Sequence, residues 1–81
     1  MTEPFVVDAR GQRCPMPVIT LARRARDLPA GSVLVVLATD PAARLDIPAW
    51  ARLRGHETLA VEEVAGSDHW RLTVRLGPRP A

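Results

Sequence analysis

The single cysteine of this 81-residue chain, Cys14, is the residue with the clearest capacity for chemistry. It lies in the segment Arg13-Cys14-Pro15-Met16-Pro17, which runs directly into the helix-like residues 18–26. Because proline is tolerated in the first turn of a helix, the two prolines predict a helix start with Cys14 at or next to the N-cap. Free amides and the positive end of the helix dipole favour an anionic sulfur there, and the charge of Arg13 acts in the same direction. We therefore predict an exposed Cys14 whose pKa is lowered.

A lone cysteine also has a simpler explanation, since free cysteine is often a small apolar residue packed beneath a helix end. The two prolines argue against it here, because they stiffen the helix start and remove two amides, which costs stability unless that shape has a use. Met16, held between them, is either an apolar docking contact or part of the core. The sequence places neither His56 nor His69 near Cys14, and His56 is interpreted as a structural or capping residue.

Length and composition predict one small domain over residues 1–81. One cysteine excludes an intramolecular disulfide or dithiol, and with two scattered histidines it provides no metal-ligand spacing, so we expect no metal site. No apolar run approaches the roughly 18 residues that cross a membrane, and the start of the chain has no basic, apolar leader. We expect a cytoplasmic protein without membrane contact.

The basic residues are all arginine, which gives a formal net charge of +2 and an isoelectric point near 10.0. Arginine binds carboxylates and phosphates in planar, bidentate geometry, so an RNA-binding or regulatory module using Arg10, Arg13, Arg23 and Arg24 is the main alternative function. The arginines are scattered, and exposed aromatic residues for base stacking are not expected, so we do not favour direct nucleic-acid binding. A thiol redox sensor is a further alternative, although such sensors usually keep a resolving thiol nearby.

Hydrophobic periodicity and turn residues predict the order βαβαββ. The first half should contain a strand over 5–8, a helix after Cys14 to about Leu28 and a central strand over 32–39. A turn at Asp40-Pro41 should follow, and then a helix that begins near Asp46, has Pro48 in its first turn and stops at Gly55. Strands over 57–64 and 69–76 and a flexible tail over 78–81 complete the chain. Right-handed crossovers then place both helices on one face of the sheet. The predicted fold class is α+β, a two-layer α/β sandwich with a four-stranded mixed sheet.

The predicted core between helices and sheet includes Leu21, Val35, Trp50 and Trp70. The strand over 32–39 is apolar on both faces, yet one face of the sheet has no helix to cover it. That uncovered face either meets a partner or a second copy of the chain, or is covered by long flanking side chains.

Five short segments of the sequence are informative in combination: Asp8-Ala9-Arg10-Gly11, Cys14-Pro15-Met16-Pro17, Thr39-Asp40-Pro41, Asp46-Ile47-Pro48-Ala49-Trp50 and Gly55-His56-Glu57. In combination they closely resemble the TusA/SirA-like family of small sulfur-carrier (sulfurtransferase) proteins. The resemblance extends from about Val6 to Leu76, and Cys-Pro-X-Pro is its specific signature. It implies the family's two-layer sandwich, in agreement with the order of elements above.

The resemblance also implies a chemistry for Cys14. It would accept a sulfane sulfur from a cysteine desulfurase or rhodanese-like donor, hold it as a persulfide and pass it to a cysteine of an acceptor protein. Family members serve tRNA thiolation, molybdenum-cofactor maturation or sulfur oxidation. No cofactor is expected beyond the covalent persulfide, and the protein would be a carrier rather than a stand-alone multi-turnover enzyme.

The neighbours of Cys14 are expected to support it or to dock partners: Arg13, Pro15, Met16 and Pro17, together with Asp40. Asp40 is interpreted from the sequence as a turn cap, and the resemblance adds a role in docking. Some family members carry a second cysteine in the helix after Trp50, where this chain has Ala51. A second internal thiol therefore has no part in the expected chemistry.

Overall fold

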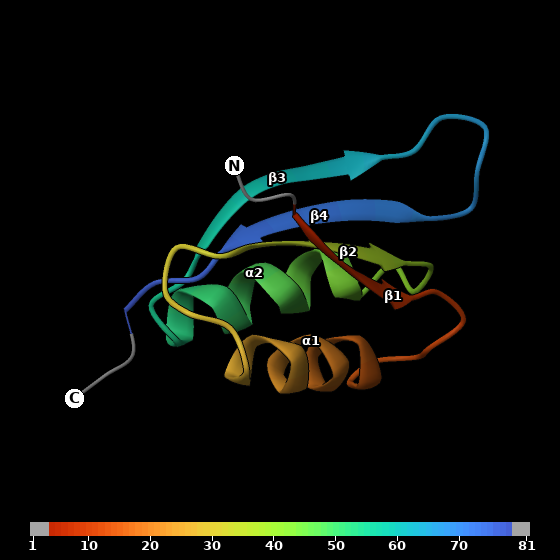
Figure 1. Ribbon diagram of the computed structural model, residues 1–81. Helices are drawn as coiled ribbons and strands as arrows, with labels where there is room; N and C mark the ends of the chain where they lie inside the picture. Colours follow the sequence, from red (N-terminus) through yellow and green to blue (C-terminus); the bar gives the residue numbers. More distant parts are fainter. Residues whose placement is uncertain (1–3, 79–81) are drawn as a thin grey trace.

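The computed structural model describes residues 4–78, and two helices cover one face of a four-stranded sheet (Figure 1). The elements are β1 (Phe5–Ala9), α1 (Met16–Arg26), β2 (Val33–Ala38), α2 (Ala43–Leu53), β3 (Glu57–Glu63) and β4 (Trp70–Arg75). The predicted order and the α+β class are confirmed. Of the predicted tail, Pro78 is exposed, and residues 79–81 lie outside the described residues. Neither helix is long and apolar enough to cross a membrane, within the part of the chain that the structure describes.

The sheet has the strand order β1-β2-β4-β3. β1 pairs with β2 in parallel, whereas β4 is antiparallel to both of its neighbours. β2 is a central strand, as its continuous apolar run predicts. Because β1 and β2 are parallel, their carboxyl ends meet at one edge of the sheet, and the loops that follow them lie together there.

The core lies between the helices and the sheet. Its fully buried members include Leu21 of α1, Ile47 of α2, and Leu34 and Leu72 of the sheet. Trp50 and Trp70 are half-buried and pack against this core, as predicted. The inclusion of Val35 was wrong, because side chains alternate along a strand and the core-facing residues of β2 are Leu34, Val36 and Ala38.

Val35 instead belongs to the uncovered face of the sheet. There Val6, Val35, Thr73 and Ala60 stand in one row across the four strands. Ion pairs flank the row on the β4 side, where Arg71 meets Glu62 at 3.4 Å and Arg75 meets Glu57. Val6, on the edge strand, is 62% exposed. Long charged side chains therefore border this face but leave apolar surface in contact with solvent.

α2 begins at Ala43, three residues before the predicted start at Asp46, and Pro48 lies inside it. The turn at Asp40 leads directly into the helix, since the amide of Ala43 donates to the carbonyl of Asp40 at 3.0 Å. Pro48 removes only the single hydrogen bond that its amide would have donated to the carbonyl of Arg44. Full burial of Ala43 and Ile47 against the sheet offsets that loss.

The end of α2 is the predicted stop at Gly55, whose φ is 78°. The amide of His56 donates to the carbonyl of Ala51 at 2.7 Å, and that of Gly55 to the carbonyl of Arg52 at 3.3 Å, which is a Schellman motif. Nδ1 of His56 accepts a hydrogen bond from the amide of Gly77 at 3.0 Å. His56 therefore ties the end of α2 to the chain that leaves β4, the structural role predicted for it.

Candidate functional site

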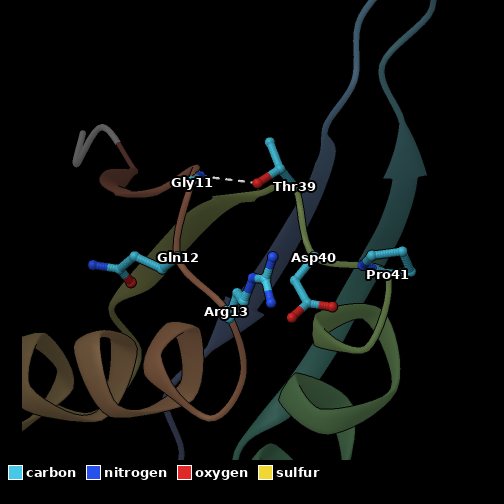
Figure 2. Close-up of a pocket in the computed structure, with 6 residues that line it drawn as sticks. All are labelled: Gly11, Gln12, Arg13, Thr39, Asp40 and Pro41. Atoms are coloured by element: carbon cyan, nitrogen blue, oxygen red, sulfur yellow. Dashed lines mark hydrogen bonds between the residues drawn. The ribbon is translucent and has the colours of Figure 1, made fainter.

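Cys14 lies where the loop after β1 enters α1, beside the loop after β2. The two loops are joined by a hydrogen bond of 2.9 Å from the amide of Gly11 to Oγ1 of Thr39 (Figure 2). Oγ1 of Thr20 donates to Oε1 of Gln12 at 3.0 Å, which fastens the first loop to the side of α1. The position of Cys14 is thus determined by the loop after β1, the loop after β2 and α1 together.

The N-cap of α1 is Pro15, so Cys14 is the residue immediately before the cap, as predicted. The peptide bond between them is cis. The amide of Met16 donates to the carbonyl of Arg13 at 2.8 Å, and this turn starts the helix. Pro17, in the first turn of α1, is buried, whereas Pro15 and Met16 are exposed, Met16 by 39%. Of the two uses predicted for Met16, membership of the core is therefore wrong.

Asp40 connects the cysteine loop to the start of α2. Its Oδ2 accepts a hydrogen bond of 2.8 Å from the amide of Cys14, and its Oδ1 accepts one of 3.0 Å from the amide of Ala42. The second bond confirms the predicted turn cap. The first joins residues that are 26 positions apart. These two amides lower the pKa of the Asp40 carboxyl, and the charge of Arg13 acts in the same direction.

The surroundings of the sulfur differ from the prediction. Cys14 is half-buried rather than exposed. Its pKa is raised to about 11, first by burial and then by the carboxylates of Asp46 and Asp40. The predicted lowering was wrong because the helix-end contribution is small beside partial burial and two nearby negative charges. The bond from the Cys14 amide to Asp40 places one of these charges directly beside the cysteine.

An open pocket of about 420 Å³ lies beside the cysteine. It is lined by Gly11, Gln12, Arg13, Thr39, Asp40 and Pro41. The side chains of Arg13 and Asp40 lie near one another in it (Figure 2). The charge of Arg13 is thus directed to Asp40 and not, as predicted, to the sulfur. The pocket therefore presents polar groups of both signs on the two loops that adjoin Cys14.

Sequence reasoning missed two members of this site. The sequence marks Asp46 only as a helix start, yet from the first turn of α2 its carboxylate contributes to the raised pKa of the Cys14 thiol. The sequence predicts Thr39 only as the end of a strand, whereas in the structure its Oγ1 accepts a hydrogen bond from the amide of Gly11. The pairing of β1 with β2 was the available signal, because parallel neighbours bring the residues that follow them to the same edge.

Several arginines are engaged by the protein itself. Arg10 forms a bidentate pair with Asp8, at 2.9 and 2.8 Å. Arg24 lies over the ring of Phe5 and Arg44 over that of Trp70, at 5.5 and 5.4 Å from the ring centroids. These contacts use arginines for internal pairing and packing. They weaken the RNA-binding alternative without bearing on Arg13 or Arg23.

Comparison with known proteins follows this geometry. A family model described as sulfurtransferase TusA matches residues 5–76. The sulfur carrier protein TusA of Pseudomonas putida strain GB-1 is 47% identical over 66 residues, which cover 82% of each chain. The putative sulfur carrier protein YrkF of Bacillus subtilis is 45% identical over 62 residues, covering 76% of this chain and 34% of that protein.

The fold has a solved counterpart. A SirA-like protein from Desulfitobacterium hafniense superposes with a TM-score of 0.78 at 28% identity, covering 90% of this chain and 97% of that one. A two-layer sandwich with one thiol at the junction of two loops and a helix therefore has the architecture of a small sulfur carrier. The chain belongs to the TusA family of sulfurtransferases and sulfur carriers.

Proposed function

We infer that Cys14 accepts a sulfane sulfur as a persulfide and relays it to a cysteine of an acceptor protein. The donor is a cysteine desulfurase or a rhodanese-like protein. The acceptor belongs to tRNA thiolation, molybdenum-cofactor maturation or sulfur oxidation. The persulfide is the only group that the protein carries for this function, and no separate cofactor takes part.

The observation that carries this proposal is the position of the single thiol, in a chain that belongs to a family of sulfur carriers. Cys14 is a free cysteine at a loop–helix junction, next to an open pocket that can receive a segment of another protein. The chain has no second cysteine that could displace the bound sulfur by forming an internal disulfide. A persulfide on Cys14 therefore persists until another protein supplies a thiol.

The experiment is intact-mass spectrometry after incubation with a cysteine desulfurase and cysteine. The parent should gain about 32 Da, one sulfur atom added to the nucleophilic thiol, and a reducing agent should remove it. Cys14→Ser should gain nothing. Subsequent incubation with a reduced acceptor protein should return the parent to its original mass.

Failure to gain sulfur from either a cysteine desulfurase or a rhodanese with thiosulfate would contradict the proposal. The same preparations should be tested for RNA binding at several salt concentrations. Tight binding with a steep salt dependence, in a protein that takes up no sulfur, would favour the nucleic-acid alternative.

A further inference from the structure

The Cys-Pro-X-Pro segment has only two backbone amides with which it can be held in place, because proline has no amide hydrogen. The amide of Met16 donates within the turn, to the carbonyl of Arg13 at 2.8 Å. The amide of Cys14 donates to Oδ2 of Asp40 at 2.8 Å, across 26 positions of the chain. Within the segment, the Cys14 amide is therefore the donor that reaches another element.

Asp40 holds this amide with a carboxylate whose other oxygen is also in use. Its Oδ1 accepts the amide of Ala42, the N-cap of α2, at 3.0 Å. The two amides lower the pKa of the Asp40 carboxyl, so that it is ionised near neutral pH and both of its oxygens accept. α2 itself is anchored by the full burial of Ala43 and Ile47. One carboxylate thus connects the backbone of Cys14 to the start of an anchored helix.

Sulfur transfer between two proteins depends on where the attacking sulfur is held. It must approach the outer sulfur of the donor persulfide along the S–S bond that breaks, and a displacement of about 1 Å can cost roughly a hundredfold in rate. A small reagent in solution can adapt its approach to a cysteine that moves, whereas a docked protein cannot. A fixed cysteine backbone therefore matters more for a protein donor than for a small molecule.

We propose that Asp40 is a positioning residue for sulfur transfer: its carboxylate fixes the backbone of Cys14 relative to α2, so that the sulfur meets the persulfide of a docked donor protein in line. The proposal rests on the function inferred above and adds a specific role for a residue that does not itself react.

The transfer step balances without an oxidant or a reductant. The Cys14 thiol releases its proton to water, and the thiolate attacks the outer sulfur of the donor's cysteine persulfide. A new S–S bond forms while the donor's S–S bond breaks. The donor cysteine leaves as a thiolate and takes up a proton from water. Asp40 exchanges no proton in this step and acts through the backbone of Cys14 alone.

Two substitutions of Asp40 separate positioning from stability. Asparagine has one side-chain carbonyl oxygen, which takes the place of two carboxylate oxygens. We expect that oxygen to accept the amide of Ala42, because asparagine forms the same local turn with the amide two residues on as aspartate does. Asp40→Asn should therefore free the Cys14 amide and keep the turn, whereas Asp40→Ala should free both amides.

Amide hydrogen exchange followed by NMR tests this assignment. Exchange at Cys14 should accelerate by about tenfold or more in both variants, as expected for the loss of a hydrogen bond to a charged group. Exchange at Ala42 should accelerate only in Asp40→Ala. Asp68→Asn is the matched control, with the same charge change at a side chain that is 89% exposed in the turn between β3 and β4. It should accelerate neither amide.

The decisive measurement is loading by a cysteine desulfurase with cysteine, followed by intact mass while the concentration of the carrier is varied. The maximal loading rate should fall by about tenfold in both Asp40 variants, even though Asp40→Asn should be the more stable of the two. The carrier concentration at half-maximal rate should change little, because the rest of the surface is unchanged. Asp68→Asn should load as the parent does.

Alkylation by iodoacetamide, a small neutral reagent, shows whether the thiol itself has been damaged. It should not slow in either Asp40 variant, because this reagent needs no fixed approach. The midpoint of its pH profile should fall, since a negative charge near the sulfur is lost. Slower transfer from a protein together with undiminished reactivity toward a small molecule is the result that a merely structural role would not produce.

Equal maximal loading rates for the parent and Asp40→Ala would overturn the proposal. A change confined to the carrier concentration at half-maximal rate would also overturn it, and would make Asp40 a docking residue instead. Alkylation that slows in proportion to loading would show general damage to the site and not a loss of positioning. A parent protein that the desulfurase does not load would contradict the inferred function itself.

Discussion

The two ends of α2 each hold a half-buried titratable side chain in its neutral form, but by different means. At the start of the helix the thiol of Cys14 has a raised pKa, because of burial and two carboxylates. At the other end burial and the charge of Arg54 lower the pKa of His56. The imidazole also contacts the ring of Trp50 at 4.9 Å and accepts the amide of Gly77.

The difference is one of enclosure. Near the Cys14 end, Arg13 and Asp40 line an open pocket, so these charged side chains are accessible from solvent. The His56 end is closed by backbone hydrogen bonds and ring contact, and a change of charge there must break structure. The charges around Cys14 are therefore open to solvent, whereas His56 is held in place by the structure around it.

The largest loss of stability should come from a change in the core beneath the middle of α2. Ile47 is fully buried on α2, one residue after Asp46. Ile47→Ala should lower the free energy of unfolding by about 2–5 kcal/mol, through lost apolar burial and the cavity that remains. Urea denaturation monitored by tryptophan fluorescence measures it. A loss no greater than that of the exposed variant Leu45→Ala would show that α2 is held by its ends and not by its core.

A smaller loss should follow at the His56 end. A Cβ on Gly77 would lie 1.9 Å from the carbonyl oxygen of Gly55, so Gly77→Ala must displace backbone. We expect a cost of about 1–3 kcal/mol. The iodoacetamide midpoint of Cys14 should remain that of the parent. A shifted midpoint would mean that the two ends are coupled through α2.

The corresponding change at the Cys14 end is Asp40→Ala. It removes the acceptor of two backbone amides, and we expect a loss of about 0.5–2 kcal/mol, as for a helix or turn cap. Unlike Gly77→Ala, it should raise the alkylation rate of Cys14, because a negative charge next to the sulfur is lost. An unchanged rate in a destabilised variant would show that the charge of Asp40 does not act on the sulfur.

The smallest effect should be a pH dependence of stability at the His56 end. His56 has a lowered pKa when folded, so the unfolded chain binds more protons as the pH falls below about 6.5. The stability due to neutral His56 is present above that pH and is lost as the pH falls through the folded value. Urea midpoints of the parent and of His56→Gln, compared across this range, should converge on acidification. Parallel curves would show that the pKa of His56 is not lowered in the folded protein.

Most of the fold was predictable because its signals are local. The apolar run of β2 indicated a central strand, the alternation in β4 indicated one buried and one wet face, and Gly55 marked the end of α2. Val35 was misassigned because an apolar strand does not reveal which of its faces meets the helices. The start of α2 was misplaced because the penalty of Pro48 is visible in the sequence, whereas the burial of Ala43 that offsets it is not.

The same division applies to the site. By itself the sequence determined that one thiol stands before a proline-framed helix, with no second cysteine to react with it. Only the tertiary structure decided how reactive that thiol is, because the parallel pairing of β1 with β2 and the docking of α2 bring Asp40 and Asp46 to a residue 26 and 32 positions away. Electrostatic energy depends on distance in space and on exposure to water, and neither can be read from spacing along the chain.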